Sequence, residues 1–341
     1  MNLTTCAKAR AATFVIAQIA ILLLAACSNS DPLPKIGIIL ADSADIYSAT
    51  IRSSFETAAA RKARLSVMDC RRDQAIAQRI AQDMMIDEAK ATVVQPVFPA
   101  AIPGLVKTAA AGGKPIVIIG RDPDEEAILG VPSAYFIGVH SIEAVEKQVQ
   151  IVAGAWKADQ SWDRNGDGRL QYLLCSSADW TIEEGKERAK ARDQAFIDAG
   201  LHAEREAEVS LGPSKAEAER GFDAKGASIN PDSAEAIFCD SDEIALGVLL
   251  AWDASPRSGA KRPLIVGIGG IGDALDSIAK GDLLGTASCD PARQGRAAYS
   301  IASITASGSD PVAIGWALQK GRFVYIPYKI VTRENYRLFL D

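Results

Sequence analysis

Two successive series of short apolar runs, each alternating with helical stretches, are the feature that most constrains this chain. The first series predicts strands and helices between residues 36 and 139, and the second begins after residue 168. Strands that alternate with helices form parallel sheets covered on both faces, so the pattern predicts an α/β fold with two doubly wound parallel-sheet lobes. Strands are expected at 36–40, 65–69, 92–97, 115–119, 134–139, 170–175, 203–210, 236–239, 264–268 and 285–288. Helices are expected at 44–61, 74–89, 102–111, 183–199, 215–222, 243–252 and 273–280.

The composition agrees with two globular domains and excludes several classes of protein. The chain has 341 residues, of which 48% are hydrophobic, and at about 150 residues per domain it is long enough for two cores. Its net charge is -6 and no Lys/Arg-rich run occurs, so a nucleic-acid-binding protein is not expected. With only His140 and His202, a His-ligated metal is disfavoured, whereas a site built from oxygen ligands is not.

The first 26 residues read as an export signal. Lys8 and Arg10 precede the apolar stretch 11–24, and small residues then lead to Cys27. The alternative, a transmembrane helix, needs about 20 apolar residues, and this stretch is shorter and contains Gln18. The ending at 24–27 resembles the lipobox of bacterial lipoproteins, which implies that Cys27 becomes a lipidated N-terminus. Residues 27–34 would then form a polar tether outside the membrane.

Four further cysteines each end an apolar run, and two interpretations of them stay open. These residues are Cys70, Cys175, Cys239 and Cys289. Small buried residues at strand ends are the favoured interpretation. The alternative is a disulfide between Cys175 and Cys239, which is possible in an oxidising compartment if their strands are neighbours.

The segment 163–171 has the spacing of a calcium-binding loop. Residues with oxygen-containing side chains stand at positions 1, 3, 5 and 9 of this segment, and glycine stands at position 6. This order allows a chain to wrap around a hard cation. Leu174 occupies the position of the carboxylate that closes an EF-hand, so a carboxylate must come from elsewhere. An Asp/Asn/Gly-rich surface turn without metal is the alternative.

This loop and the strand after it resemble those of the bacterial periplasmic galactose/glucose-binding proteins. In that family a distant glutamate before a later strand completes the site, and Glu235 stands at the matching point. The resemblance implies a structural Ca²⁺ bound by Asp163, Asn165, Asp167, the main chain of Arg169, Gln171 and Glu235.

The same resemblance covers nearly the whole chain after residue 35 and implies a class I periplasmic binding protein. Its two lobes, joined by three crossovers, close over a small ligand. The first lobe is expected at 35–138 and 291–325, and the second at 139–290 and 326–341. The implied function is substrate binding for an ABC transporter permease, at the outer face of a membrane that carries the lipid anchor. A sensor that presents its ligand to a chemoreceptor or sensor kinase is the alternative.

The cleft residues match the family only in part. Sugars are held by rings that stack on their C–H faces and by charged groups that bond their hydroxyls. The candidate ligand-binding residues are Asp45, Tyr47, Arg121, Trp180, Glu184, Arg188, Ser241 and Asp290. Polar residues of the family are replaced by Gly120, Ser241, Gly269 and Cys289, so a ligand other than glucose is expected: another sugar, a sugar derivative with an anionic group, or another small polar molecule.

A glycine-rich segment at 267–272 offers a competing interpretation. It follows a predicted strand, opens a helix and fits the spacing of a dinucleotide-binding loop, which would make the protein an oxidoreductase. However, it comes late in the second series, and the helix after it is short. The residues around the cysteines and histidines give no nucleophile–base pair, so an enzyme is not expected.

Overall fold

The computed structural model describes residues 33–177, 182–229, 233–255 and 261–340. The predicted export signal at 1–26, the lipidation site Cys27, the tether up to residue 32 and Trp180 therefore lie outside the described residues. Residues Lys35–Asp341 form one compact unit. None of the helices in the described ranges has both the length and the apolar character needed to cross a membrane.

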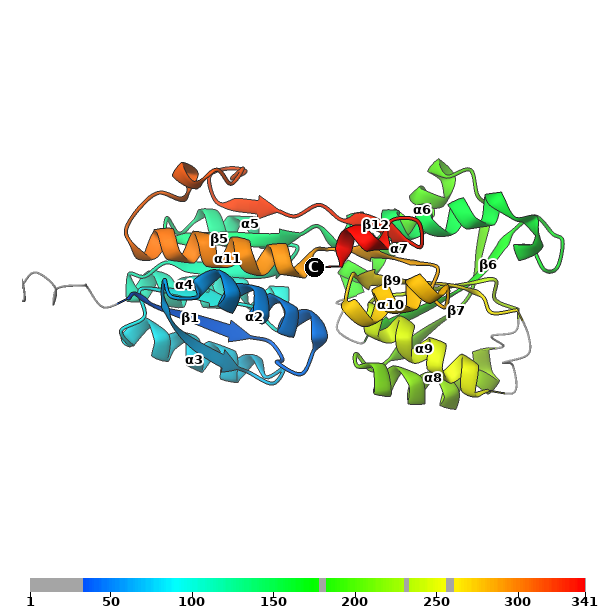
Figure 1. The fold of residues 1–341 in the computed structure, drawn as a ribbon, viewed down its shortest axis with the longest axis horizontal. Helices are drawn as coiled ribbons and strands as arrows, with labels where there is room; N and C mark the ends of the chain where they lie inside the picture. The colour runs from blue at the N-terminus through cyan, green and yellow to red at the C-terminus, as the bar shows by residue number, and fades with distance from the viewer. Residues whose placement is uncertain (1–32, 178–181, 230–232, 256–260, 341) are drawn as a thin grey trace, which may run out of the picture. The chain divides into compact units, whose positions relative to one another are not determined.

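The first lobe is built on a six-stranded sheet in the order β11-β5-β4-β3-β1-β2, with every neighbouring pair parallel (Figure 1). Its strands are β1 (Lys35–Leu40), β2 (Arg64–Asp69), β3 (Ala91–Val94), β4 (Ile116–Arg121), β5 (Ala134–Val139) and β11 (Phe323–Tyr325). Its helices are α2 (Ile46–Ala59), α3 (Gln74–Ile86), α4 (Ile102–Gly112), α5 (Glu125–Leu129) and α11 (Pro291–Ala306), with the short turns η1 (Pro99–Ala101) and η4 (Pro311–Ile314).

The second lobe repeats this plan in the strand order β12-β10-β9-β8-β6-β7. Its strands are β6 (Leu170–Ser177), β7 (Ala203–Leu211), β8 (Ala236–Cys239), β9 (Leu264–Gly269), β10 (Gly285–Ser288) and β12 (Lys329–Thr332). Its helices are α6 (Ser141–Ala158), α7 (Ile182–Asp198), α8 (Lys215–Ile229), α9 (Asp242–Ala254) and α10 (Gly272–Lys280), with η2 (Gln160–Trp162) and η5 (Tyr336–Phe339). β12 runs antiparallel to β10, so the second sheet is mixed where a wholly parallel one was predicted.

The chain passes between the two sheets three times. It leaves the first sheet after β5 and returns after β10, through α11, which packs on α2 and on the strands of the first sheet. It leaves again between β11, which pairs with β5, and β12, which pairs with β10. The predicted α/β fold with two doubly wound lobes and three crossovers is confirmed.

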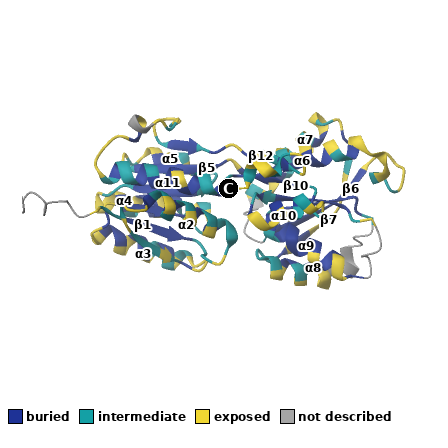
Figure 2. Cartoon of the chain, viewed as in Figure 1, coloured by how far each residue is buried: buried dark blue, intermediate teal, exposed yellow. Residues whose placement is uncertain are grey.

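Clusters of buried apolar residues lie on both faces of each sheet, and strands such as β1 are drawn as buried in Figure 2. In β1, Ile36 and Ile38 belong to the cluster under α2 and α11, whereas Ile39 belongs to the cluster under α3 and α4. All of these side chains are fully buried. Parallel strands covered on both faces carry continuous apolar runs instead of alternating ones, which explains why these strands could be recognised from the sequence.

The predicted strand at 92–97 is too long. β3 ends at Val94, Gln95 still donates its backbone N–H to the carbonyl oxygen of Ile39 in β1, and the chain leaves the sheet at Pro96. Proline has no N–H to donate to a neighbouring strand. Residues 96–99 therefore lie outside the sheet, where they line the pocket described below.

The four cysteines of the described residues are buried, and all are free thiols. Cys175 and Cys239 do lie opposite each other on the neighbouring strands β6 and β8, as the disulfide alternative required. The structure nevertheless has no bond between them. Burial raises the pKa of the Cys239 thiol well above its usual value, and the hydrogen bond and charge of Cys175 act in the same direction. Such a thiol stays protonated and unreactive.

Candidate ligand-binding cleft

A pocket of about 460 Å³ lies at the carboxyl ends of the strands of both sheets. In open parallel sheets this edge is where ligands bind, because the loops after the strands diverge there. The first lobe contributes residues that end or follow β1 to β5, and the second contributes residues that end or follow β6 to β10. The charged lining residues are Asp42, Asp45, Arg72, Arg121, Arg188, Asp240, Asp242 and Glu243.

Five of the eight candidate ligand-binding residues line this pocket, namely Asp45, Tyr47, Arg121, Arg188 and Ser241. Glu184, in the first turn of α7, and Asp290 are not among the lining residues. Asp290 has a positive φ of 46° and caps α11 by accepting a hydrogen bond from the backbone N–H of Arg293. Trp180 lies outside the described residues. Contact of the five with a ligand stays a prediction.

Asp45 and Tyr47 are held at the start of α2. Asp45 is the N-cap of this helix, and its Oδ2 accepts hydrogen bonds from the backbone N and the Oγ of Ser48 at 2.9 and 2.7 Å. The Tyr47 hydroxyl donates to Oε1 of Gln294 at 2.8 Å. These bonds fix a carboxylate and an aromatic ring at the pocket before any ligand arrives, which reduces the entropy lost on binding.

Arg188 is buried beside Asp240, a carboxylate that was not predicted to bind the ligand. Its Nη2 donates to Oδ1 of Asp240 at 2.7 Å, and both side chains are only 6% exposed. Its Nη1 donates to the carbonyl oxygen of Ser141 at 3.4 Å. One turn further along α7, Arg192 is 2% exposed and lies over the ring of Phe238. Burial lowers the pKa of Arg192, while the charge of Asp240 acts in the opposite direction.

Several other lining residues were also missed as ligand candidates, among them Gln95, Phe98, Arg72 and Glu243. Gln95 is buried, and its Oε1 accepts a hydrogen bond from the backbone N of Ala41. Phe98 is 43% exposed, which makes it an unusually open aromatic ring. A prediction that β3 ends at Val94 would have identified Gln95 and Phe98 as well, because the residues that follow a strand in such a sheet are candidates for ligand binding.

The glycine-rich segment is occupied by a side chain of the protein itself. Oδ2 of Asp242 accepts hydrogen bonds from the backbone N atoms of Gly270 and Ile271 at 2.6 and 3.0 Å, and its Oδ1 accepts one from Thr286 Oγ1 at 2.6 Å. A Cβ at Gly267 would lie 2.2 Å from Oδ1 of Asp242. The N–H groups that a dinucleotide phosphate would need therefore bind this carboxylate, and the glycines make room for it. Burial raises the pKa of Asp242 to about 6.

In the loop 163–171, side-chain oxygens accept hydrogen bonds from groups of the loop itself. Asp163 accepts hydrogen bonds from the backbone N atoms of Gly166 and Gly168 at 2.8 and 2.9 Å, and both glycines have positive φ. The backbone N atoms of Asp167 and Arg169 donate to the side chains of Asn165 and Asp167, respectively. Nε2 of Gln171 also donates to Asp167.

Glu235 is fully buried at the base of this loop. Its carboxylate accepts hydrogen bonds from the backbone N atoms of Arg164 and Gln171, at 2.6 and 3.0 Å. Oε1 of Gln171 is buried without a hydrogen-bond partner, and burial raises the pKa of Glu235. A divalent cation would satisfy both groups, so the donor set fits one. Over the described part of the chain, however, no three His, Cys, Asp or Glu side chains form a ready cluster for a metal ion.

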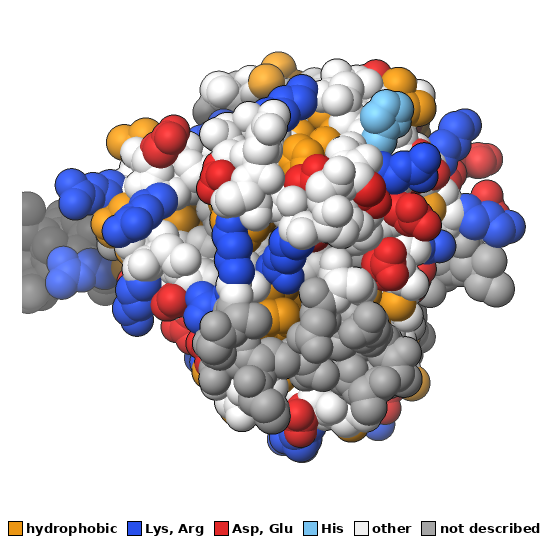
Figure 3. Space-filling model, turned by 90° about the vertical axis from the view of Figure 1, so that its right-hand side faces the viewer, with side chains coloured by type: hydrophobic (Ala, Val, Ile, Leu, Met, Phe, Trp, Pro, Cys, Tyr) orange, Lys and Arg blue, Asp and Glu red, His pale blue; other side chains and the backbone are white. Residues whose placement is uncertain are grey.

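Basic and acidic side chains are interspersed on the face of the second lobe seen in Figure 3. Nucleic-acid-binding surfaces gather positive charge along one face or helix. This face has no such separation of charge, in agreement with the net charge of -6.

Comparison with known proteins decides the family. Residues 36–310 match the model of the periplasmic binding protein domain. The chain belongs to the periplasmic binding protein family. Members of this family are binding proteins, so the oxidoreductase interpretation of 267–272 is wrong. The family also places this chain outside the cytoplasm.

Individual relatives agree with this assignment. The chain is 29% identical over 288 residues to the D-galactose/methyl-galactoside binding periplasmic protein MglB of Haemophilus influenzae, an alignment that spans 81% of this chain and 82% of the relative. A solute-binding protein of an ABC transporter from Bacillus halodurans, solved with myo-inositol, has a TM-score of 0.73 at 21% identity and covers 92% of this chain and 99% of its own. One from Actinobacillus succinogenes, solved with D-allose, has a TM-score of 0.73 at 18% identity and covers 89% and 99%.

Proposed function

We propose that this protein captures an uncharged sugar or sugar-like polyol between its lobes and delivers it to an ABC transporter permease. The observation that carries the proposal is the charge and shape of the pocket. Its volume of about 460 Å³ is within the range of small-molecule sites. Rings and paired charged groups line it from both lobes, which suits C–H faces and hydroxyls.

An uncharged ligand is favoured over an anionic one. Carboxylates in the lining outnumber guanidinium groups, since Asp42, Asp45, Asp240, Asp242 and Glu243 face the pocket with Arg72, Arg121 and Arg188. Arg188 and Arg72 are already paired with Asp240 and Asp42. A sugar acid or sugar phosphate would meet an excess of negative charge, whereas each paired group can still bond a hydroxyl.

The relatives support a sugar-like ligand. The Haemophilus influenzae relative is named for D-galactose and methyl-galactoside, and the two solved structures hold myo-inositol and D-allose. All four are uncharged polyhydroxy compounds. The replacements at Gly120, Ser241, Gly269 and Cys289 lead us to expect a ligand other than glucose.

We propose that Ca²⁺ occupies the loop 163–171 as a structural ion. Asp163, Asn165, Asp167 and Gln171 would supply side-chain oxygens, Arg169 its carbonyl oxygen and Glu235 its carboxylate. The unpartnered oxygen of Gln171 and the buried carboxylate of Glu235 support this assignment. The ion would tie the start of β6 to the start of β8.

We also propose that Cys27 carries a lipid that anchors the protein to a membrane, because residues 8–27 have the order of charged, apolar and small residues of a lipoprotein signal. When the full chain is expressed in a bacterium, mass spectrometry of the membrane fraction is expected to show a mature chain that begins at a diacylated Cys27. A Cys27→Ser chain should lack this mass. A wild-type chain with an unmodified Cys27 would disprove the anchor.

A ligand panel tests the function. We expect at least one uncharged sugar or polyol, among galactose, allose, arabinose and myo-inositol, to raise the melting temperature, because a ligand that binds only the folded state stabilises it. Galacturonate and galactose 6-phosphate serve as matched anionic compounds and should give no shift. Stabilisation by the anionic compounds alone would contradict the proposed ligand class.

A further inference from the structure

Glu243 lies where the two lobes meet at the pocket. It is the second residue of α9 in the second lobe, and its Oε1 is 3.5 Å from the backbone N of Ile46, the first residue of α2 in the first lobe. The side chain also lines the pocket. Its surroundings therefore depend on the first lobe being in place.

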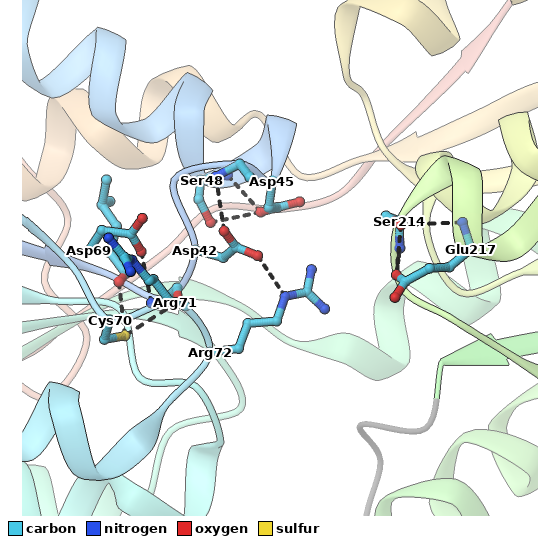
Figure 4. A network of polar contacts seen from close by, with 12 residues as sticks. Asp42, Asp45, Ser48, Asp69, Cys70, Arg71, Arg72, Ser214 and Glu217 are labelled. Atoms are coloured by element: carbon cyan, nitrogen blue, oxygen red, sulfur yellow. Dashed lines mark hydrogen bonds and ion pairs between the residues drawn. The ribbon is translucent and has the colours of Figure 1, made fainter.

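The first lobe presents three charged groups to Glu243, namely Asp42, Asp45 and Arg72. Asp45 is fixed by Ser48 as the cap of α2. Arg72 is fixed by Asp42, whose Oδ2 accepts a hydrogen bond from its Nε at 2.8 Å (Figure 4). Arg71 and Arg72 both have positive φ, 50° and 61°, a conformation that costs non-glycine residues energy and that here turns Arg72 to the pocket.

The second lobe adds charged groups that are already paired. Asp242, next to Glu243, is bonded to the loop at Gly270 and to Thr286. On α8, which packs against α9, Lys215 pairs with Asp273. Glu217 on the same helix accepts hydrogen bonds from the hydroxyl and backbone N of Ser214, which lower its pKa, and Arg72 contributes to the same effect (Figure 4).

The surroundings of Glu243 change how strongly it holds a proton, and the first lobe supplies part of them. Burial raises its pKa from 4.5 to about 7, and the charges of Asp45 and Asp42 act in the same direction. The backbone N–H of Ile46 and the charge of Arg72 oppose the change but do not cancel it. Separation of the lobes would remove the facing carboxylates of Asp45 and Asp42 and the part of the burial that the first lobe supplies.

We infer that Glu243 is a proton-binding residue coupled to lobe closure, so that the cleft takes up one proton as it closes on its ligand and releases it on opening. This inference rests on the proposed function, in which closure captures the ligand. A group that binds protons more tightly in one state favours that state as the pH falls. Closure should therefore become more favourable between pH 8 and pH 6, by at most about tenfold, the limit set by a pKa of about 7 in the closed form and the ordinary carboxyl value of 4.5 in the open form.

The test measures the distance between the lobes without any ligand, so failure of the sugar panel would leave its outcome unaffected. Spin labels at Arg79→Cys on α3 and Arg220→Cys on α8, two exposed positions, report the distance by double electron–electron resonance. The full chain carries Cys6→Ser and Cys27→Ser, and the other four cysteines are buried. Distances are recorded at pH 8 and pH 6.

In the otherwise unchanged chain, the population with the shorter distance is expected to grow severalfold from pH 8 to pH 6. Glu243→Gln, which mimics the protonated side chain, should show the larger population at both pH values and no change between them. Glu217→Gln, the matched control on the neighbouring helix, should keep the pH dependence. Distances that do not change with pH, or a pH dependence that persists in Glu243→Gln, would overturn the inference.

Discussion

Replacement of Asp240 by alanine is expected to lower the free energy of unfolding by about 3–5 kcal/mol, the range measured when one partner of a buried ion pair is removed. Asp240 lies 2.7 Å from Arg188, with both side chains 6% exposed. It is also the nearby negative charge for the buried Arg192. Without it, the buried guanidinium groups of Arg188 and Arg192, one helical turn apart, would lose the carboxylate that lies near both. Urea denaturation measures the loss.

Two further variants separate this effect from a general loss of charge. Asp253→Ala removes a carboxylate that is also 2.7 Å from an arginine, Arg262, but is 47% exposed, so it should cost less than about 1 kcal/mol. Arg188→Met leaves Asp240 beside Arg192, so the chain should fold while ligand binding weakens. An Asp240→Ala variant as stable as Asp253→Ala would show that the buried ion pair does not support this lobe.

Removal of Ca²⁺ is expected to lower the melting temperature. A ligand that binds only the folded state stabilises it by about 2.7 kcal/mol at a hundred times its dissociation constant. The expected stabilisation depends on Glu235, whose side chain is fully buried. Its carboxylate accepts hydrogen bonds from the backbone N atoms of Arg164 in the loop and Gln171 in β6. Differential scanning calorimetry in Ca²⁺ and in EGTA measures the difference.

Variants of two carboxylates make this test specific. Glu235→Ala should abolish the difference between Ca²⁺ and EGTA, whatever its own melting temperature. Glu204→Gln changes a carboxylate on the neighbouring strand β7 that is 57% exposed and 3.6 Å from Arg169, and it should keep the full difference. A wild-type chain with the same melting temperature in both solutions would disprove the metal site.

The fold could be predicted because its strongest signals are local. Strands such as β1 and β5 are continuous apolar runs, since both faces of each sheet are covered. Four elements at the joins were not predicted: α6 and α11, which follow the first and second crossovers, and β11 and β12 on either side of the last. The short β11 and β12 owe their place to the strands beside them, β5 and β10, and such pairing leaves little trace in the local sequence.

The cleft could be predicted only in part, because burial and pairing decide its chemistry. Asp45, Tyr47 and Arg188 were found through the family resemblance, and all three line the pocket. The partner of Arg188, Asp240, is 52 residues away in the chain. Burial raises the pKa of Glu243, and the charges of Asp45 and Asp42, about 200 residues earlier in the other lobe, add to the rise. Interactions at such separations have no sequence period that could reveal them.

The central claim is that the pocket between the two sheets binds one uncharged polyol. Isothermal titration calorimetry of the full chain with the sugar that gives the largest thermal shift tests it most directly. We predict one ligand per chain, with binding at least about tenfold weaker in Arg188→Met, because a charged hydrogen bond to a hydroxyl contributes about 1.5–3 kcal/mol and its loss leaves other polar groups unpaired. Unchanged affinity in a folded Arg188→Met chain would place the ligand outside this pocket and contradict the account.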